Sequence, residues 1–179
     1  LGITGSGKSS TLDTIIDANN RTVDAHIVII ASPVELIHEP IRCVVRHREV
    51  GSDVTSFKDG AIQALRQDPD IVYVGEIRDK ETATIAIQSA LTGHLVFSTL
   101  HTNDAPSAIT RMIDLGAETF LICASVEAIV AQRLVRKVCT GCKTEMVPTE
   151  EMLMELSLEP EEVAGKKFCY GAGCEACNK

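Results

Sequence analysis

Short runs of apolar residues recur along the first part of the chain, and each is bounded by polar or turn-forming residues. Apolar runs without polar interruption are typical of strands that are covered on both faces of a sheet. Such runs occur at His26–Ile30 and Ile71–Val74, and we expect a third strand at His94–Leu100. The segment Cys43–Val50 alternates only partly between apolar and polar residues, and we interpret it as a more exposed strand.

Between these runs, apolar residues recur at the spacing of an amphipathic helix. Ser56 provides a cap for one of the helices, Asp68-Pro69 stops it, and Gly93 closes the next. The expected helices are Ser10–Asn19, Ser56–Gln67, Lys80–Thr92, Asp104 to about Leu115, and Thr119 to about Val138.

Strands that alternate with helices require crossover connections, so the pattern predicts an α/β fold with a mainly parallel sheet. Ligands of such sheets bind at the carboxyl ends of the strands. Polar residues follow two of the expected strands at this edge: Gly75-Glu76 comes after Val74, and His101-Thr102 comes after Leu100.

The composition changes after Val138, where the apolar periodicity fades and acidic residues and cysteines accumulate. We therefore expect a core over residues 1–138 and a small C-terminal element over residues 139–179. Only Leu1 precedes a glycine-rich loop of a kind that normally follows a buried strand. We accordingly expect the chain to be a fragment of a longer protein, with the first strand and an N-terminal domain outside it.

The charge and composition narrow the functional classes. The net charge is −8, so the chain has little with which to neutralise a nucleic-acid backbone, and we expect no nucleic-acid partner. The stretch Phe120–Val135 is interrupted by Glu127, Gln132 and Arg133 and is a poor membrane span. We see no secretory signal.

The first chemical motif is Gly2-Ile3-Thr4-Gly5-Ser6-Gly7-Lys8-Ser9, which has the form G-x-x-x-x-G-K-S. Glycines allow backbone N–H groups to cradle phosphate oxygens, the lysine reaches the β and γ phosphates, and the serine hydroxyl binds Mg²⁺. The helix that follows directs its positive end at the same anion. We therefore expect ATP with Mg²⁺ here, Ser9 being the magnesium ligand. The assigned nucleotide-binding residues are Gly2, Thr4, Gly5, Ser6, Gly7, Lys8, Ser9 and Ser10.

Three further residues are candidates for the reaction. Glu76 follows a buried strand, where a carboxylate can orient the attacking water of a phosphoryl transfer. His101 ends the next strand, within reach of a γ-phosphate. Glu35 follows the strand His26–Ile30 at the same edge. His94 begins its strand at the opposite end and by itself is more simply a structural histidine.

The cysteines concentrate near the end of the chain, as two C-x-x-C pairs with 31 residues between them. Two such pairs supply four thiolates for tetrahedral Zn²⁺, and four protein ligands make the site structural. We predict a zinc site at Cys139, Cys142, Cys174 and Cys177. Unligated thiols are the alternative, and Cys169 is a candidate for a different ligand arrangement.

Taken together, these segments resemble the secretion ATPases of type II secretion and type IV pilus assembly. The resemblance covers nearly the whole chain up to the cysteine segment, and members of the assembly branch also carry a tetracysteine element. It is carried by Leu65-Arg66-Gln67-Asp68-Pro69-Asp70, Val74-Gly75-Glu76-Ile77-Arg78-Asp79, Thr92-Gly93-His94-Leu95-Val96, Ser98-Thr99-Leu100-His101-Thr102-Asn103-Asp104-Ala105 and Ala131-Gln132-Arg133-Leu134-Val135-Arg136.

The resemblance implies a RecA-like P-loop NTPase core and a homo-hexamer. It also implies a cytoplasmic motor that associates peripherally with the inner membrane and works with an inner-membrane platform and cytoplasmic adaptor proteins. In that family Glu76 corresponds to the Walker B glutamate, and Gly75 before it is usual. His94 and His101 correspond to the histidine box, which assigns His94 to nucleotide binding.

One segment departs from the family. The family's acidic box reads Glu-Asp-Pro-Val-Glu, whereas this chain has Ala31-Ser32-Pro33-Val34-Glu35. We expect an ATP-hydrolysing motor subunit for pilin or pseudopilin assembly. The alternative is a nucleotide-binding but catalytically weak structural subunit of the same machinery. A nucleic-acid translocase on a related core is a third option, which the acidic charge and the cysteine element disfavour.

Overall fold

The structure is a computed structural model that describes residues 1–159 and 161–177. The chain divides into two compact units, Leu1–Leu134 and Val135–Lys179. The division falls slightly before the boundary expected near Val138. Residues 160 and 178–179 of the expected C-terminal element lie outside the described residues.

A four-stranded sheet forms the centre of the first unit, with the order β2-β1-β3-β4 and parallel pairing throughout. The expected α/β fold with a mainly parallel sheet is confirmed. The strands are β1 (His26–Ala31), β2 (Val44–Glu49), β3 (Ile71–Val74) and β4 (Leu95–Ser98). β1 and β3 lie between other strands and are almost fully buried, as their unbroken apolar runs predict.

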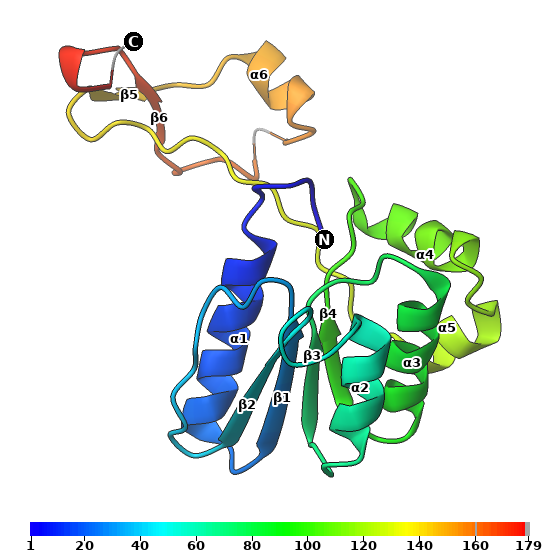
Figure 1. The fold of residues 1–179 in the computed structure, drawn as a ribbon. Coiled ribbons are helices and arrows are strands. Elements are labelled where there is room, and N and C mark those ends of the chain that lie inside the picture. The colour runs from blue at the N-terminus through cyan, green and yellow to red at the C-terminus, as the bar shows by residue number, and fades with distance from the viewer. Residues whose placement is uncertain (160, 178–179) are drawn as a thin grey trace. The chain divides into compact units, whose positions relative to one another are not determined.

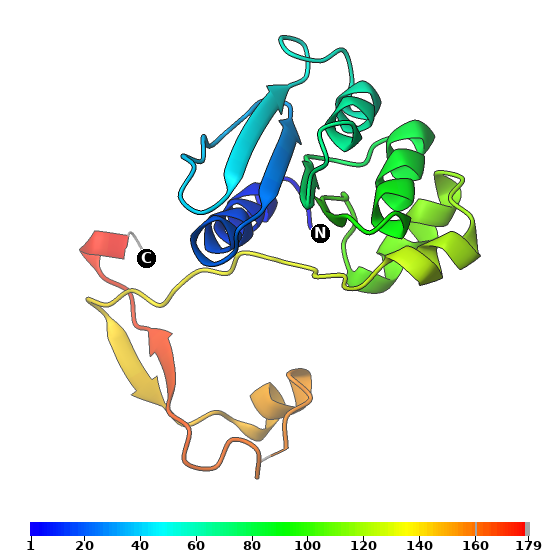
Figure 2. The same ribbon diagram turned by 90° about the horizontal axis from the view of Figure 1, so that it is seen from below.

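Different helices cover the two faces of the sheet (Figures 1 and 2). Successive side chains of a strand point to opposite faces, so those of β1 pack against both layers. On one face Ile27 and Ile29 pack with Ile16 of the first helix. On the other face Val28 and Ile30 join the core beneath the second helix. Because both faces are covered by apolar helix surfaces, the strand carries no polar alternation.

Three helices of the first unit begin at a residue whose side chain caps them. Ser56, Asp79 and Asp104 each accept a hydrogen bond from a backbone N–H of the following first turn. The helices are α1 (Lys8–Thr22), α2 (Phe57–Leu65), α3 (Lys80–Leu91), α4 (Ala105–Asp114) and α5 (Thr119–Ser125). No helix in the described part of the chain is long and apolar enough to cross a membrane.

The prediction of a long helix from Thr119 to about Val138 is wrong, because α5 ends at Ser125. The chain then runs beside Leu1: the Leu1 nitrogen donates to Val130 O at 2.6 Å, and Gln132 N donates to Leu1 O at 2.9 Å. This pair of bonds has the pattern of a parallel strand ladder. An apolar segment suits a strand as well as a helix, and here the available backbone partner decides between them.

The second unit is small and contains a two-stranded antiparallel sheet. Its elements are β5 (Lys143–Met146), α6 (Glu150–Glu155), β6 (Phe168–Gly171) and the short 3-10 helix η1 (Glu175–Cys177). The strands are mostly exposed, and Leu153 is a buried residue of this unit. A unit with so little apolar core needs another source of stability.

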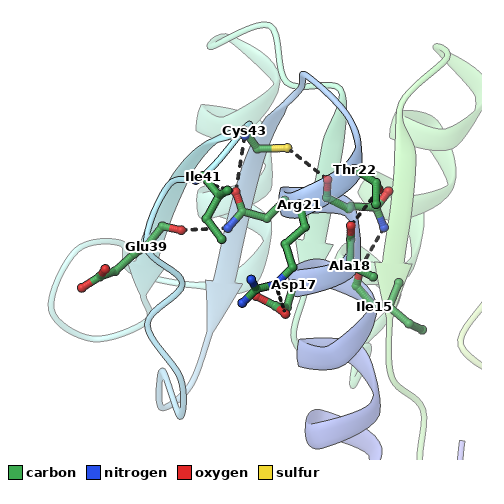
Figure 3. A network of polar contacts seen from close by, with 10 residues as sticks. Ile15, Asp17, Ala18, Arg21, Thr22, Glu39, Ile41 and Cys43 are labelled. Carbon is green, nitrogen blue, oxygen red and sulfur yellow. Dashed lines mark hydrogen bonds and ion pairs between the residues drawn. The ribbon is translucent and has the colours of Figure 1, made fainter.

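The loop between β1 and β2 is fixed to the end of α1 by Asn20, whose side chain is buried. Its amide nitrogen donates to Glu39 O at 2.8 Å, and its Oδ1 accepts from Ile41 N at 3.0 Å and from Cys43 N at 3.4 Å. The backbone groups of Glu39, Ile41 and Cys43 face the last turns of α1 (Figure 3). One side chain thus satisfies three backbone groups of this loop.

Replacing Asn20 with Ala leaves three backbone groups, two part-buried and one buried, without this side-chain partner. Each unsatisfied group costs about 1–3 kcal/mol, and we expect the free energy of unfolding of the first unit to fall by about 2–4 kcal/mol. Urea denaturation followed by circular dichroism measures this. The matched control is Asn103→Ala at an exposed position, for which we expect a change within about 0.5 kcal/mol. Equal effects of both substitutions would contradict the role given to Asn20.

Candidate functional site

The glycine-rich loop turns sharply and leads directly into α1. Gly5 and Gly7 have φ values of 79° and 83°, in the left-handed region that other residues rarely adopt. Gly7 is the N-cap of α1, so the unpaired N–H groups of the first helical turn begin at the end of the loop. A helix start preceded by such a loop is a favourable place for an anion.

Lys8 lies back across this loop. Its Nζ donates to Gly2 O at 2.9 Å and to Ile3 O at 3.2 Å, and it lies 3.5 Å from Nδ1 of His101. A lysine ammonium has only donors, so Nδ1 of His101 accepts in this contact. The lysine of the first motif therefore meets a residue that lies 93 positions further along the chain.

His101 continues to Glu76. Its Nε2 lies 3.0 Å from Oε1 of Glu76, while the second carboxylate oxygen is 2.6 Å from Nε of Arg78. With Nδ1 accepting from Lys8, the Nε2–H of a neutral His101 donates to Glu76. Lys8, His101, Glu76 and Arg78 thus form one chain of polar contacts in which both oxygens of Glu76 are held. Sequence reasoning did not identify Arg78 as part of the site.

A cavity of about 520 Å³ opens beside this chain of contacts. Most of the residues assigned from the sequence line it: Thr4, Gly5, Gly7, Lys8, Ser9, Ser10, Glu35, Glu76 and His101. Gly2 and Ser6 are buried within the loop. Ala31 and Ser32, at the end of β1, also border the cavity. The structure therefore gathers the phosphate loop, the acidic strand ends and the altered acidic box around one space.

His94 is not brought to this cavity. Its Nδ1 lies 3.0 Å from Ser89 O and 3.1 Å from Oγ1 of Thr92, next to the end of α3. These contacts place it at the amino end of β4, whereas the phosphate loop borders the carboxyl ends of the strands. Within this chain His94 is a residue with local partners, separate from His101.

Gly75, which precedes Glu76, lies in close contact with the end of β1. A Cβ added there would lie 3.1 Å from Ile30 O and 3.3 Å from Cα of Ala31. Gly75 N donates to Ile30 O at 2.8 Å, and Gly75 O accepts from Oγ1 of Thr99, also at 2.8 Å. The end of β3 is thus held so close to the end of β1 that a side chain at position 75 would require these neighbours to shift by a few tenths of an ångström.

A buried polar cluster on the α1 side of the sheet was not found from the sequence. Asp13 of α1 lines the cavity and lies 3.4 Å from Nε2 of His38, whose side chain is only 2% exposed. His38 stacks on His47, and burial together with His38 lowers the pKa of His47. Burial, aided by Asp13 and Glu35, raises the pKa of Tyr73 to about 12, so its phenol stays protonated.

Gln132 is a second residue whose place the sequence did not reveal. Its Nε2 donates to Ser6 O at 2.7 Å, and its Oε1 accepts from Oγ1 of Thr11 at 2.6 Å. It lies in the extended segment after α5. The only sequence signal was its occurrence in the string Ala131–Arg136, to which we gave no role.

The four cysteines of the two C-x-x-C pairs meet in the second unit, with their sulfur atoms within 4.8 Å of one another. The Sγ atoms of Cys139 and Cys174 are 3.8 Å apart, as are those of Cys142 and Cys177. A zinc tetrahedron with Zn–S distances of about 2.3 Å requires S···S distances of about 3.8 Å, whereas a disulfide requires about 2.05 Å. The separations therefore fit a metal tetrahedron. Cys169 lies on β6, opposite Glu145, and is not a member of the cluster.

A parallel α/β sheet with a glycine-rich loop at the start of its first helix defines a nucleotide-binding class of protein. A family model described as "Type II/IV secretion system protein" matches residues 1–179, and the chain belongs to this family. The resemblance found in the sequence is therefore confirmed.

Individual relatives agree with this assignment. The chain is 46% identical over 176 residues to the type IV pilus assembly ATPase PilB of Thermus thermophilus, covering 98% of this chain and 19% of that relative. It is 46% identical over 179 residues to the type II secretion system protein E of Aeromonas hydrophila, covering 99% of this chain and 34% of that relative. It thus spans about a fifth to a third of the length of these relatives.

Among solved structures, the chain is similar to a crystal structure of the pilus retraction motor PilT with bound ADP. The TM-score is 0.72 at 43% identity, covering 75% of this chain and 41% of that chain. The fold of this chain is therefore similar to that of a pilus motor of known structure.

Proposed function

We propose that this chain is the ATP-binding and ATP-hydrolysing core of a motor subunit. The motor would drive assembly of pilins or pseudopilins in type IV pilus biogenesis or type II secretion. The observation that carries the proposal is the chain of contacts from Lys8 through His101 to Glu76 at the edge of a cavity bordered by the glycine-rich loop. The names of the relatives support the choice of machinery.

The residues around the cavity fit a nucleoside triphosphate with Mg²⁺. The left-handed glycines and the free N–H groups at the start of α1 suit a phosphate chain, and Lys8 carries the charge to hold it. The hydroxyl of Ser9, in the first turn of α1, is the ligand for Mg²⁺, which neutralises phosphate charge when bound. In this arrangement Lys8 exchanges its contacts with the loop carbonyls for phosphate oxygens.

Glu76 orients and polarises the attacking water in the proposed reaction. Its carboxylate is only 16% exposed and is aimed by His101 and Arg78, so its direction is set before substrate binds. The Nε2–H of His101 is bonded to Glu76, so in the proposed reaction His101 donates to the γ-phosphate only after exchanging that hydrogen bond. Glu35 adds a second carboxylate to the same cavity.

The remaining proposals concern the whole protein. We propose a homo-hexamer in the cytoplasm, peripherally associated with the inner membrane, with an inner-membrane platform and cytoplasmic adaptors as partners. The assignment of His94 to nucleotide binding requires a contact from outside this chain, since its neighbours here lie at the other end of β4. We also propose that Cys139, Cys142, Cys174 and Cys177 hold a structural Zn²⁺.

Glu76→Gln preserves the size of the side chain but removes the carboxylate that polarises water. In the full-length protein we expect ATP binding to persist while kcat falls at least about tenfold, since the loss of a general base typically costs about 10²–10⁴-fold. Phosphate release and fluorescent-nucleotide binding measure the two quantities. Glu155→Gln, on the exposed face of α6, is the matched control with unchanged turnover. An unchanged kcat in Glu76→Gln would refute the assignment.

The altered acidic box bears on the alternative, a nucleotide-binding subunit that hydrolyses ATP poorly. Ala31 and Ser32 border the cavity where two carboxylates of the family pattern are absent. We expect the natural full-length protein to hydrolyse ATP, and the double substitution Ala31→Glu with Ser32→Asp to raise kcat less than about tenfold, since Glu76 and Glu35 remain. A larger rise from an undetectable starting rate would favour the structural subunit.

The sulfur geometry predicts one Zn²⁺ per chain. We expect elemental analysis of the purified protein to find about one zinc, and Cys142→Ser to lower it below half, because zinc affinity depends on its thiolate ligands. Cys169→Ser should retain the metal, because Cys169 lies outside the cluster. Less than half a zinc per chain in the unmodified protein, with the cluster thiols freely titratable, would overturn the site.

A further inference from the structure

The side chain of Gln132 connects the glycine-rich loop, at Ser6, with the first turns of α1, at Thr11, although both are far from it in sequence. Both ends of its amide are used: Nε2 donates to Ser6 O at 2.7 Å, and Oε1 accepts from Oγ1 of Thr11 at 2.6 Å. Its own backbone is held as well, since Gln132 N donates to Leu1 O at 2.9 Å. The side chain therefore has a defined position and orientation.

The glycines of the motif make room for this residue. A Cβ added at Gly7 would lie 2.8 Å from Nε2 of Gln132, and one at Gly2 would lie 2.5 Å from its backbone oxygen. Both are closer than real Cβ contacts, so any side chain at either position would displace Gln132 or the loop. The loop and Gln132 are packed against each other directly.

The bond to Ser6 O has a consequence for the next residue. Ser6 C=O and Gly7 N–H belong to the same peptide unit, and in a trans peptide they point in opposite directions. Holding the carbonyl toward Gln132 therefore turns the Gly7 N–H away from Gln132. Gly7 lines the cavity and caps α1, so this N–H is one of the donors available to an anion there.

We propose that Gln132 is a positioning residue for nucleotide binding, which fixes the Ser6–Gly7 peptide with its N–H directed at the phosphates. The proposal rests on the proposed function, because it takes this loop to be the phosphate site. Gln132 acts through the loop and has no contact with the reacting groups. The loop that it positions binds the ground state and the transition state alike, so the loss of Gln132 weakens nucleotide binding more than it slows the chemical step.

The test compares dissociation constants for MgATP and MgADP in the full-length protein. Gln132→Ala removes two hydrogen bonds, and we expect both constants to rise about tenfold while kcat at saturating ATP changes less than about threefold. Gln132→Glu retains the acceptor for Thr11 but places a carboxylate against Ser6 O. It should bind no better than Gln132→Ala. Gln88→Ala, on the exposed face of α3, is the matched control with unchanged constants.

Substitutions of Thr11 test the hydrogen bond from Thr11 to Gln132 separately from the bond between Gln132 and Ser6 O. Thr11→Ser keeps the hydroxyl and should bind nucleotide like the unmodified protein, whereas Thr11→Val should weaken binding about threefold. Combined with Gln132→Ala, the Thr11→Val substitution should add little, because the partner is already absent. Full additivity would show that the two residues act separately and would overturn the proposed arrangement.

The outcomes distinguish this inference from the proposed function. If the unmodified protein binds MgATP no better than the Lys8→Ala variant does, the nucleotide site itself is overturned. Nucleotide binding that is lost in Lys8→Ala but stays within about twofold in Gln132→Ala overturns only the role of Gln132. A lower melting temperature of Gln132→Ala with unchanged dissociation constants also overturns it, since that result is the signature of a purely structural contact.

Discussion

The parallel register of β1, β3 and β4 is the constraint on which the site depends. Ile30, Val74 and Ser98 lie side by side, so the three strands reach their carboxyl ends together. The close approach at Gly75 and the bond from Ile77 N to Thr99 O, at 3.0 Å, tie these ends to one another. Glu76 and His101 follow from strands that are already aligned, and the 3.0 Å contact between them is a result of that alignment.

The charges of Lys8 and Glu76 in the site are each balanced by a polar or charged neighbour. A neutral His101 links the ammonium of Lys8 with the carboxylate of Glu76, and Arg78 covers the second oxygen of that carboxylate. A nucleotide that drew Lys8 to its phosphates would change the partner of His101 and, through it, the surroundings of Glu76. The geometry therefore links substrate binding to the proposed base through one side chain.

The second unit depends on a different physical principle. Its strands are short and largely exposed, and few of its side chains are buried. Four sulfur atoms lie at the spacing of a metal tetrahedron, and the proposed Zn²⁺ would supply the cross-link that so small a core lacks.

The local sequence pattern by itself determined most of the secondary structure of the first unit. The apolar runs and capping residues predicted four strands and the starts of most helices, since side-chain periodicity and capping depend on neighbouring residues. The motif residues around Lys8 and Glu76 were also assigned correctly to one edge of a parallel sheet. Only the tertiary structure ended α5 at Ser125 and joined Gln132 to Ser6 and Asp13 to His38. Those contacts join residues distant in the chain, and neither periodicity nor spacing reveals which partners the packing brings together.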